Sequence, residues 1–219
     1  MPFGQTAPTL RVTEIFASLQ GESTRVGLPT VFVRLTGCPL RCLWCDTDYA
    51  FRGGETLGLQ AILDDVSAHA LHYVCVTGGE PLSQPACLAL LTALCEAGHS
   101  VSLETSGALD IGGVDPRVSR IVDLKPPGSG EAGRNRIENI ALLNAHDEIK
   151  IVLADEADYQ WARQQIAAHR LAERCPVLLS PVTNRLDPTR LAEWIVRDRL
   201  PVRFQLQLHK LLWKEARGR

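Results

Sequence analysis

The sequence predicts one α/β domain over residues 1–219, folded as an incomplete (β/α) TIM-like barrel of about six to seven mostly parallel strands. Three observations predict this fold. Short apolar runs alternate with longer amphipathic segments, as in right-handed βαβ units. The chain is shorter than the roughly 250 residues of a complete eight-fold barrel. The strand segments also repeatedly place polar residues on one face, which indicates a concave sheet around a wet cavity.

The expected elements alternate along the chain. We expect strands at residues 30–36, 73–77, 101–105, 121–125, 149–153, 177–180 and 202–209. Helices are expected between most of them, at residues 59–71, 85–97, 137–145, 157–168 and 188–197. Because the chain shows no internal repeat, low-complexity tract or domain linker, we expect a single domain.

All seven strand segments carry polar residues on one face, and five of them also carry a set of apolar residues on the other, since side chains two apart share a face. The apolar sets, which suit a layer of helices, are Val31, Val33 and Leu35; Val74 and Val76; Val101 and Leu103; Val122 and Leu124; Leu206 and Leu208. The polar sets are Arg34 and Thr36; Thr77; Ser102, Glu104 and Ser106; Asp123 and Lys125; Lys150; Ser180; Gln205, Gln207 and His209. A flat sheet with one solvated face would need antiparallel hairpins, and the long helical connections argue against them.

Two helix ends carry specific signals. Gly98 follows segment 85–97 where a left-handed residue commonly ends a helix. Asp187 before Pro188 is typical of an N-cap followed by proline in the first turn. With parallel strands between these helices, we expect the chemistry at the C-terminal ends of the strands.

Composition limits the function. The formal net charge is −2 and no run of Lys or Arg stands out, so we expect a small-molecule substrate and no nucleic-acid partner. No apolar stretch reaches the roughly 20 residues that cross a bilayer, so we expect no membrane association. Seven cysteines in a chain without an apolar N-terminal signal segment favour reduced thiols and a cytoplasmic location.

The most informative motif is a group of three cysteines. Cys38, Cys42 and Cys45 are separated by three and then two residues, directly after the first expected strand. Four thiolates normally hold a four-iron cluster, so a site with three leaves one iron open to another ligand. A zinc site would need a fourth ligand, and the nearest candidates lie more than twenty residues away. Buried core thiols are the other alternative.

This spacing resembles the cluster motif of the radical S-adenosylmethionine (SAM) superfamily. The resemblance implies a 4Fe-4S cluster held by Cys38, Cys42 and Cys45, with SAM on the open iron. An electron from the cluster would then cleave SAM to a 5′-deoxyadenosyl radical. Trp44 is similar to the aromatic residue beside the adenine in that superfamily, although it could equally shield the cluster from water.

Further segments resemble the SAM contacts of the superfamily. Gly78, Gly79 and Glu80 end the second expected strand, where a glycine pair lets the backbone approach a ligand closely, or simply makes a turn. The resemblance implies cofactor-binding roles for these three residues. It implies the same for positions near the ends of the later strands: Thr105, Ser106, Asp123, Lys125 and Ser180.

Residues near the two ends of the chain narrow the substrate. Gln20, Glu22 and Arg34 could together recognise a flat heterocycle with an amide edge and a carboxylate, because Arg forms paired hydrogen bonds with carboxylates. A glycine turn and a solvated Glu are the structural alternative. Near the other end, His209 is expected on the polar face of the last strand, where it binds substrate or is a structural histidine.

The Leu19-Gln20-Gly21-Glu22 segment together with Leu206-Gln207-Leu208-His209-Lys210 resembles the 7-carboxy-7-deazaguanine synthase family over nearly the whole chain. That family converts 6-carboxy-5,6,7,8-tetrahydropterin to 7-carboxy-7-deazaguanine with loss of ammonia, in queuosine and preQ0 biosynthesis. The resemblance implies a carbon–nitrogen lyase that is a homodimer and takes electrons from a protein such as flavodoxin. The implied substrate contacts are Leu19, Gln20, Gly21, Glu22, Arg34, Thr77 and His209.

The same resemblance implies that Mg²⁺ assists the reaction and that Thr47, two residues after Cys45, is its protein ligand. A hydroxyl oxygen suits this hard cation, although Thr47 could also be an ordinary loop residue. Two other functions stay open on the sequence. One is a radical SAM activase of a glycyl-radical enzyme, and the other is a zinc-stabilised binding module.

Overall fold

One nine-stranded sheet organises the part of the chain that the computed structural model describes, residues 8–214 and 216–218. Residues 1–7 and 219, the ends of the expected domain, lie outside the described residues. The strand order is β3-β1-β2-β4-β5-β6-β7-β8-β9. From β2 onward this order follows the chain and every neighbouring pair is parallel, so the expected incomplete barrel is confirmed.

The strands have the following bounds: β1 (Thr9–Leu19), β2 (Pro29–Leu35), β3 (Glu55–Gly58), β4 (Tyr73–Gly78), β5 (Ser100–Thr105), β6 (Ser119–Asp123), β7 (Glu148–Leu153), β8 (Val177–Pro181) and β9 (Arg203–Phe204). The helices are α1 (Leu59–Ala68), α2 (Cys87–Glu96), α3 (Glu156–Ala168), α4 (Pro188–Asp198) and α5 (Leu208–Trp213). Short 3₁₀ turns lie at Asp48–Phe51, Pro81–Ser83, Pro127–Ser129, Ala132–Arg134, Ile137–Leu142 and Leu171–Glu173.

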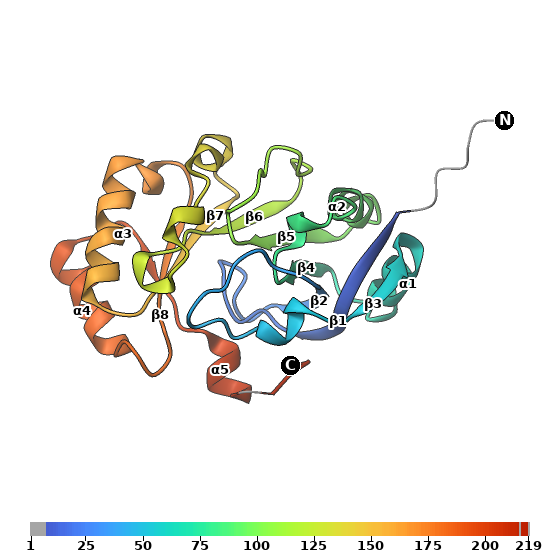
Figure 1. Cartoon of the computed structure of the whole chain (residues 1–219), viewed down its shortest axis with the longest axis horizontal. Coiled ribbons are helices and arrows are strands. Elements are labelled where there is room, and N and C mark those ends of the chain that lie inside the picture. Colours follow the sequence, from blue (N-terminus) through green and yellow to red (C-terminus); the bar gives the residue numbers. More distant parts are fainter. Residues whose placement is uncertain (1–7, 215, 219) are drawn as a thin grey trace.

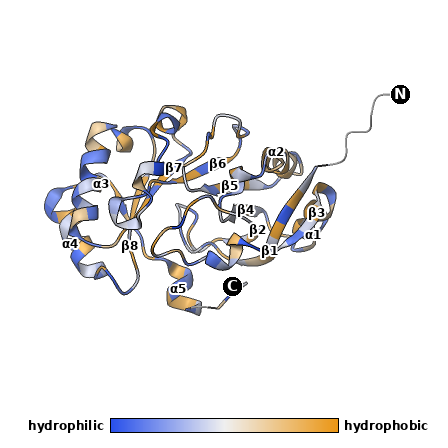
Figure 2. Cartoon of the chain, viewed as in Figure 1, coloured by the Kyte–Doolittle hydropathy of each residue, from blue (hydrophilic) through white to orange (hydrophobic). Residues whose placement is uncertain are grey.

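The helices α1 to α4 surround the strands, while α5 lies apart from them near the C-terminus (Figure 1). The apolar residues expected to face the helices on β2, β4, β5 and β6 all belong to the buried core. In Figure 2 the central strands are mainly hydrophobic, whereas α3 and α4 carry hydrophilic as well as hydrophobic residues. None of the described helices has the length and apolar character that a membrane span requires.

Two strands at one edge of the sheet were not expected. Strand β1 pairs antiparallel with both β2 and β3, which extends the parallel sheet by two strands. A register shift between Val12 and Glu14 interrupts the alternation of β1. Leu10 and Val12 are buried in the core before it, and Ile15 packs against the core after it. A bulge of this kind hides the period of two that marks a strand in a sequence.

The expected helix at 137–145 is wrong, because the chain forms only the short 3₁₀ turn Ile137–Leu142. Asn139 explains the difference. Its buried side-chain amide donates to the carbonyls of Gly107 and Leu109, and its oxygen accepts from the backbone N–H of Ile111. These long-range bonds hold the turn against the preceding loop.

The expected strand at 202–209 is also wrong beyond its first residues. Only Arg203–Phe204 pairs with β8, and α5 begins at Leu208. The Gln205 side chain bonds both backbone groups of Ser23, and the N–H of Leu208 donates to the carbonyl of Gly21. These bonds direct the chain away from the sheet edge and toward the N-terminal loop.

Both helix-end signals are confirmed. Gly98 follows α2 with a φ of +88°, the left-handed conformation that glycine adopts without strain. The Asp187 carboxylate accepts from the backbone N–H of Thr189 at 2.8 Å and caps α4.

Candidate active site

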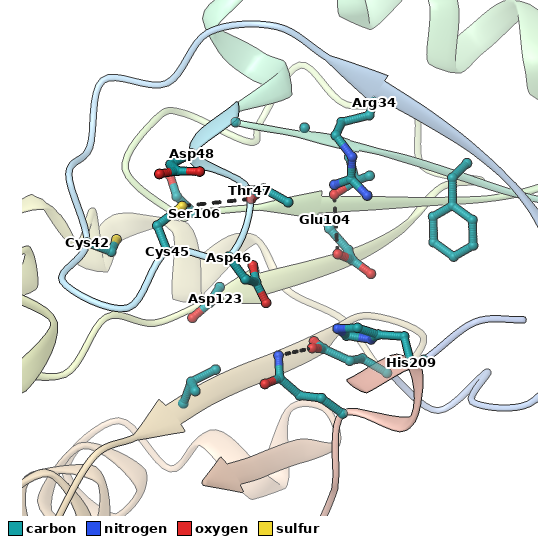
Figure 3. Close-up of a pocket in the computed structure, with 18 of the residues that line it drawn as sticks. Arg34, Cys42, Cys45, Asp46, Thr47, Asp48, Glu104, Ser106, Asp123 and His209 are labelled. Atoms are coloured by element: carbon teal, nitrogen blue, oxygen red, sulfur yellow. Dashed lines mark hydrogen bonds between the residues drawn. The ribbon is translucent and has the colours of Figure 1, made fainter. Parts of the chain in front are cut away.

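A cavity of about 510 Å³ opens at the C-terminal ends of the parallel strands. It is lined by the loop after β1, the loop after β2, the ends of β4 to β7, and α5. All the site residues expected from the sequence line this cavity except Glu80 and Ser180. Residues far apart in the chain, among them Cys42, Asp123 and His209, surround the same space (Figure 3).

Cys38, Cys42 and Cys45 lie together on the loop after β2, and all three are free and partly exposed. Cys75, Cys87 and Cys175 are buried elsewhere. Three thiols on one loop, facing one cavity, fit the three protein ligands of a 4Fe-4S cluster. Tetrahedral zinc would hold its ligand atoms only about 4 Å apart. Within residues 8–214 and 216–218, no three His, Cys, Asp or Glu side chains converge in that way on a single ion.

The charge around these thiols bears on their ionisation. Burial raises the pKa of Cys38 and Cys42, and the ammonium group of Lys125 opposes that rise in both. Burial would lower the pKa of Lys125, but the carboxylate of Asp123 and the Cys42 thiol raise it. Asp123 pairs with Lys125 at 2.9 Å. A cation beside cysteine side chains favours the thiolate form that binds iron.

A neighbouring loop braces the cysteine loop. The N–H of Leu43 donates to the carbonyl of Ser129 at 3.0 Å, and the N–H of Arg41 donates to the Glu131 carboxylate at 2.5 Å. The buried Asp158 accepts from the N–H of Gly128 at 2.8 Å and holds the bracing loop in turn. No signal in the sequence connects Asp158 with the cysteine loop, since the contact depends on the packing of α3.

The glycine pair after β4 packs directly against the cysteine loop. Gly78 has a φ of +154°, a backbone conformation that other residues rarely adopt. A Cβ atom at Gly79 would lie 2.2 Å from the carbonyl oxygen of Gly37 and 2.8 Å from the Cβ of Cys38. Only glycine therefore fits at this position, and it brings the end of β4 against the loop that carries the thiols.

Glu80 was expected to bind a cofactor, but its side chain lies outside the cavity. The carboxylate is fully buried and accepts from the N–H of Leu82 at 3.0 Å, the N–H of Ser106 at 2.7 Å and the hydroxyl of Thr105 at 2.9 Å. Glu80 therefore fixes the turn after β5 from behind. Ser180, the other exception, is fully buried on β8 and does not line the cavity.

Glu22 lies at the centre of a polar network that lines the cavity. Its carboxylate forms an ion pair with Lys150 and accepts from the Gln207 amide at 2.5 Å. Burial alone would raise the pKa of Glu22, but Lys150 and His209 hold it below its usual value. The backbone N–H of Glu22 donates to the side-chain oxygen of Gln20. The cavity therefore presents the ionised carboxylate of Glu22 and the side-chain amide of Gln20.

Arg34 and Thr77 also line the cavity. Arg34 points from β2 into the cavity above Glu104 (Figure 3), and Glu104 accepts from the Thr77 hydroxyl at 3.3 Å. Glu104 and Lys150, two of the polar strand residues predicted from the sequence to face inward, also line the cavity. Polar residues on the inward faces of β5 and β7 are the sequence feature that predicts their place in the cavity.

His209 reaches the cavity from α5 and not from a strand, contrary to expectation. Its ring lies against Gly21, where an added Cβ would stand 2.3 Å from Nδ1. Lys210, the next residue, forms an ion pair at 2.9 Å with Asp46 of the cysteine loop. The short helix α5 therefore connects the loop around Gly21 with the cysteine loop.

Replacement of Gly21 by Ala is expected to displace His209 from the cavity. The backbone of Gly21 does not have a positive φ, so the clash with the imidazole is the main effect. We expect KM for the substrate to rise about as much as in His209→Ala, with little change in the melting temperature. Steady-state kinetics and thermal unfolding of Gly21→Ala, His209→Ala and the control Gly58→Ala check this, since a Cβ at Gly58 meets no atom. Wild-type KM in Gly21→Ala would contradict it.

Comparison with known proteins gives a consistent result. Residues 32–126 match the Radical SAM superfamily. The chain is 48% identical to the 7-carboxy-7-deazaguanine synthase of Chlorobaculum tepidum, over 97% of this chain and 99% of that protein. It is 42% identical to the 7-carboxy-7-deazaguanine synthase of Koribacter versatilis, over 95% of this chain and all of that protein.

Solved structures share the fold. The structure of QueE from Escherichia coli matches with a TM-score of 0.75 at 24% identity, over 92% of this chain and 95% of that one. SuiB from Streptococcus suis matches with a TM-score of 0.56 at 13% identity, over 78% of this chain and 46% of that one. At these identities the two matches concern the fold alone.

Proposed function

Because the chain belongs to the 7-carboxy-7-deazaguanine synthase family of radical SAM enzymes, we propose that it converts 6-carboxy-5,6,7,8-tetrahydropterin to 7-carboxy-7-deazaguanine with loss of ammonia. This reaction serves the biosynthesis of 7-deazapurines such as queuosine and preQ0. One observation supports the proposal most strongly. A single cavity is lined both by three free cysteines of one loop and by Gln20, Glu22 and Arg34. One radical SAM domain would then comprise the whole chain.

The family implies a 4Fe-4S cluster and SAM, and the chemistry they supply when bound is a 5′-deoxyadenosyl radical. In our proposal Cys38, Cys42 and Cys45 hold the cluster. SAM would be contacted by residues that line the cavity beside the cysteines, on the cysteine loop and at the ends of the neighbouring strands: Trp44, Gly78, Gly79, Thr105, Ser106, Asp123 and Lys125. Glu80 would act indirectly, by fixing Thr105 and Ser106. Ser180 would support the wall of the cavity from β8.

The substrate would lie between Arg34 and the network around Glu22. The guanidinium of Arg34 can form paired hydrogen bonds with the substrate carboxylate. Glu22, held ionised by Lys150 and His209, can accept hydrogen bonds from the guanidine-like edge of the pterin. Gln20 can both donate and accept, while Thr77 and His209 would complete the polar contacts. Leu19 and Gly21 would contribute packing and backbone groups.

In our proposal Mg²⁺ is the third cofactor and would bind at Thr47. The hydroxyl of Thr47 lines the cavity 3.8 Å from the sulfur of Cys45. Asp46 and Asp48 flank Thr47 (Figure 3), so oxygen atoms, the preferred ligands of Mg²⁺, predominate here. This donor set fits one protein hydroxyl bound to the ion, with water and the substrate carboxylate as the other ligands.

We expect Thr47→Ala to weaken the response to Mg²⁺, because the hydroxyl ligand is lost while the loop keeps its backbone. The concentration of Mg²⁺ that gives half-maximal turnover should rise about tenfold or more, as for the loss of one good ligand contact. Thr47→Ser keeps the hydroxyl and should stay close to the wild type. Turnover titrated with MgCl₂ after chelator treatment checks this, and equal responses of the Ala and Ser variants would exclude Thr47 as a ligand.

Three finer assignments complete the proposal. A low-potential protein such as flavodoxin would supply the electron. A homodimer is supported by the open sheet, because both residues of its last strand, Arg203 and Phe204, are exposed. A cytoplasmic location is supported by seven free cysteines.

The direct test is turnover by anaerobically reconstituted protein with SAM, MgCl₂, reductant and the carboxytetrahydropterin. We expect 7-carboxy-7-deazaguanine and ammonia in equal amounts, with SAM acting catalytically. Formation of 5′-deoxyadenosine without consumption of the pterin would show that the assigned substrate is wrong. Zinc without iron or sulfide in protein purified without oxygen would contradict the radical SAM assignment.

A further inference from the structure

The guanidinium of Arg34 is held on one side by Glu14 of the neighbouring strand. Arg34 Nε donates to Glu14 Oε1 at 2.6 Å, and the Tyr49 hydroxyl donates to the same oxygen at 2.8 Å. The guanidinium also lies 5.8 Å from the centre of the Tyr49 ring and 5.9 Å from that of Phe16. Glu14 and Arg34 are direct cross-strand partners on β1 and β2.

The bulge in β1 is the reason that Glu14 reaches Arg34. Leu10 and Val12 are buried on the core side of the sheet. An uninterrupted alternation would place Glu14 on that same side. The register shift between Val12 and Glu14 turns the carboxylate to the cavity side instead. An acidic residue here is therefore built into the backbone geometry of the strand.

The contact leaves the terminal nitrogens of Arg34 available. Across the described residues, Nε is the one side-chain nitrogen of Arg34 that donates to a protein acceptor. Arg34 lines the cavity, and the two terminal nitrogens carry the pair of N–H groups that a carboxylate binds in a fork. Because Arg has several rotatable bonds, an anchored Nε removes much of the freedom that binding would otherwise have to restrict.

We propose that Glu14 is a positioning residue, which holds Arg34 by its Nε so that the terminal nitrogens face the carboxylate of the substrate. Tyr49 fixes Glu14 in turn, through its hydroxyl. Glu14 itself does not touch the substrate and acts through Arg34. The inference rests on the proposed function, since it takes a carboxylated pterin as the substrate.

The test compares two stable ligands that differ in one group, 6-carboxypterin and pterin. Their dissociation constants are measured for the reconstituted enzyme with SAM, from the quenching of pterin fluorescence. We expect the wild type to prefer 6-carboxypterin by about ten- to a hundredfold, as for charge-assisted hydrogen bonds, and Arg34→Ala to show almost no preference. Glu14→Ala should lose about five- to tenfold of the preference, while its affinity for pterin changes little.

Glu14→Gln separates positioning from general structure. Its amide oxygen can still accept from Arg34 Nε and from the Tyr49 hydroxyl, so most of the preference should return. Tyr49→Phe should lose about two- to fivefold, because Glu14 then has one partner fewer. Glu55→Gln, on the exposed strand β3, is the matched control and should behave as the wild type. In turnover, KM for the carboxytetrahydropterin should rise in Glu14→Ala while KM for SAM stays unchanged.

The outcomes distinguish this inference from the proposed function. Equal binding of both ligands by the wild type would contradict the assigned substrate class. A wild type that prefers 6-carboxypterin, together with a Glu14→Ala variant that keeps the full preference, would overturn the role of Glu14 and leave the function intact. If Glu14→Ala does not fold, Glu14→Asp, one methylene shorter, takes its place. Unchanged preferences in both Glu14→Asp and Tyr49→Phe would then overturn the inference.

Discussion

Alanine at Cys38, Cys42 or Cys45 is expected to abolish both iron incorporation and SAM cleavage. These are the three thiols that line the cavity from one loop, and the described part of the chain offers no other cysteine on that wall. Loss of one thiolate leaves two protein ligands for a cluster that needs three of them. Each variant should contain less than about a tenth of the wild-type iron and sulfide and should form no 5′-deoxyadenosine.

Cys87→Ala and Cys95→Ala are the matched controls. Cys87 is the first residue of α2 and is buried in the core, and Cys95 lies half-buried near the end of the same helix. Both should keep the absorption and electron paramagnetic resonance spectra of the cluster and cost only packing, about 1 kcal/mol of stability. Loss of the cluster in either control would show that the ligands have been assigned wrongly.

Glu80→Ala is expected to have the second largest effect, on both stability and SAM binding. The substitution leaves the N–H groups of Leu82 and Ser106 and the Thr105 hydroxyl without their acceptor in a buried place. Each buried group that loses its partner costs about 1–3 kcal/mol, so the three groups together should cost at least about 3 kcal/mol. The turn after β5 should also loosen, which would weaken SAM binding by about tenfold or more.

Denaturant unfolding and equilibrium binding of SAM measure these two effects. Glu80→Gln keeps one acceptor oxygen, but its NH₂ group faces donors, so we expect an intermediate loss. Glu96→Ala, at the exposed end of α2, is the control and should change stability by less than about 0.5 kcal/mol. If Glu80→Ala reduced SAM affinity without any loss of stability, a direct contact with the cofactor would explain the result better than support of the turn.

The sequence predicted the strands β2, β4, β5, β6, β7 and β8 well. The residues that identify each of these strands are neighbours in the sequence, so their pattern can be recognised without knowledge of the packing. Arg34 lies between Val33 and Leu35, and Ser102 lies between Val101 and Leu103, and this period of two is a local property. The edge strand β1 was missed because its bulge breaks that period. The end of α2 at Gly98 and the start of α4 at Asp187 were also predicted, since a helix cap depends on a few neighbouring residues.

By itself, the sequence determined the parallel barrel, the spacing of Cys38, Cys42 and Cys45, and the polar residues at the strand ends. These features follow from side-chain chemistry and from short-range geometry. Only the tertiary structure decided that Glu80 supports a turn outside the cavity, that His209 arrives on α5, and that Glu14 anchors Arg34. Each of these contacts joins residues from different elements. For His209, long-range hydrogen bonds of Gln205 and Leu208 override the local strand pattern. For Glu14, the bulge in β1 does so. Such contacts depend on how the elements pack, which no local period in the chain encodes.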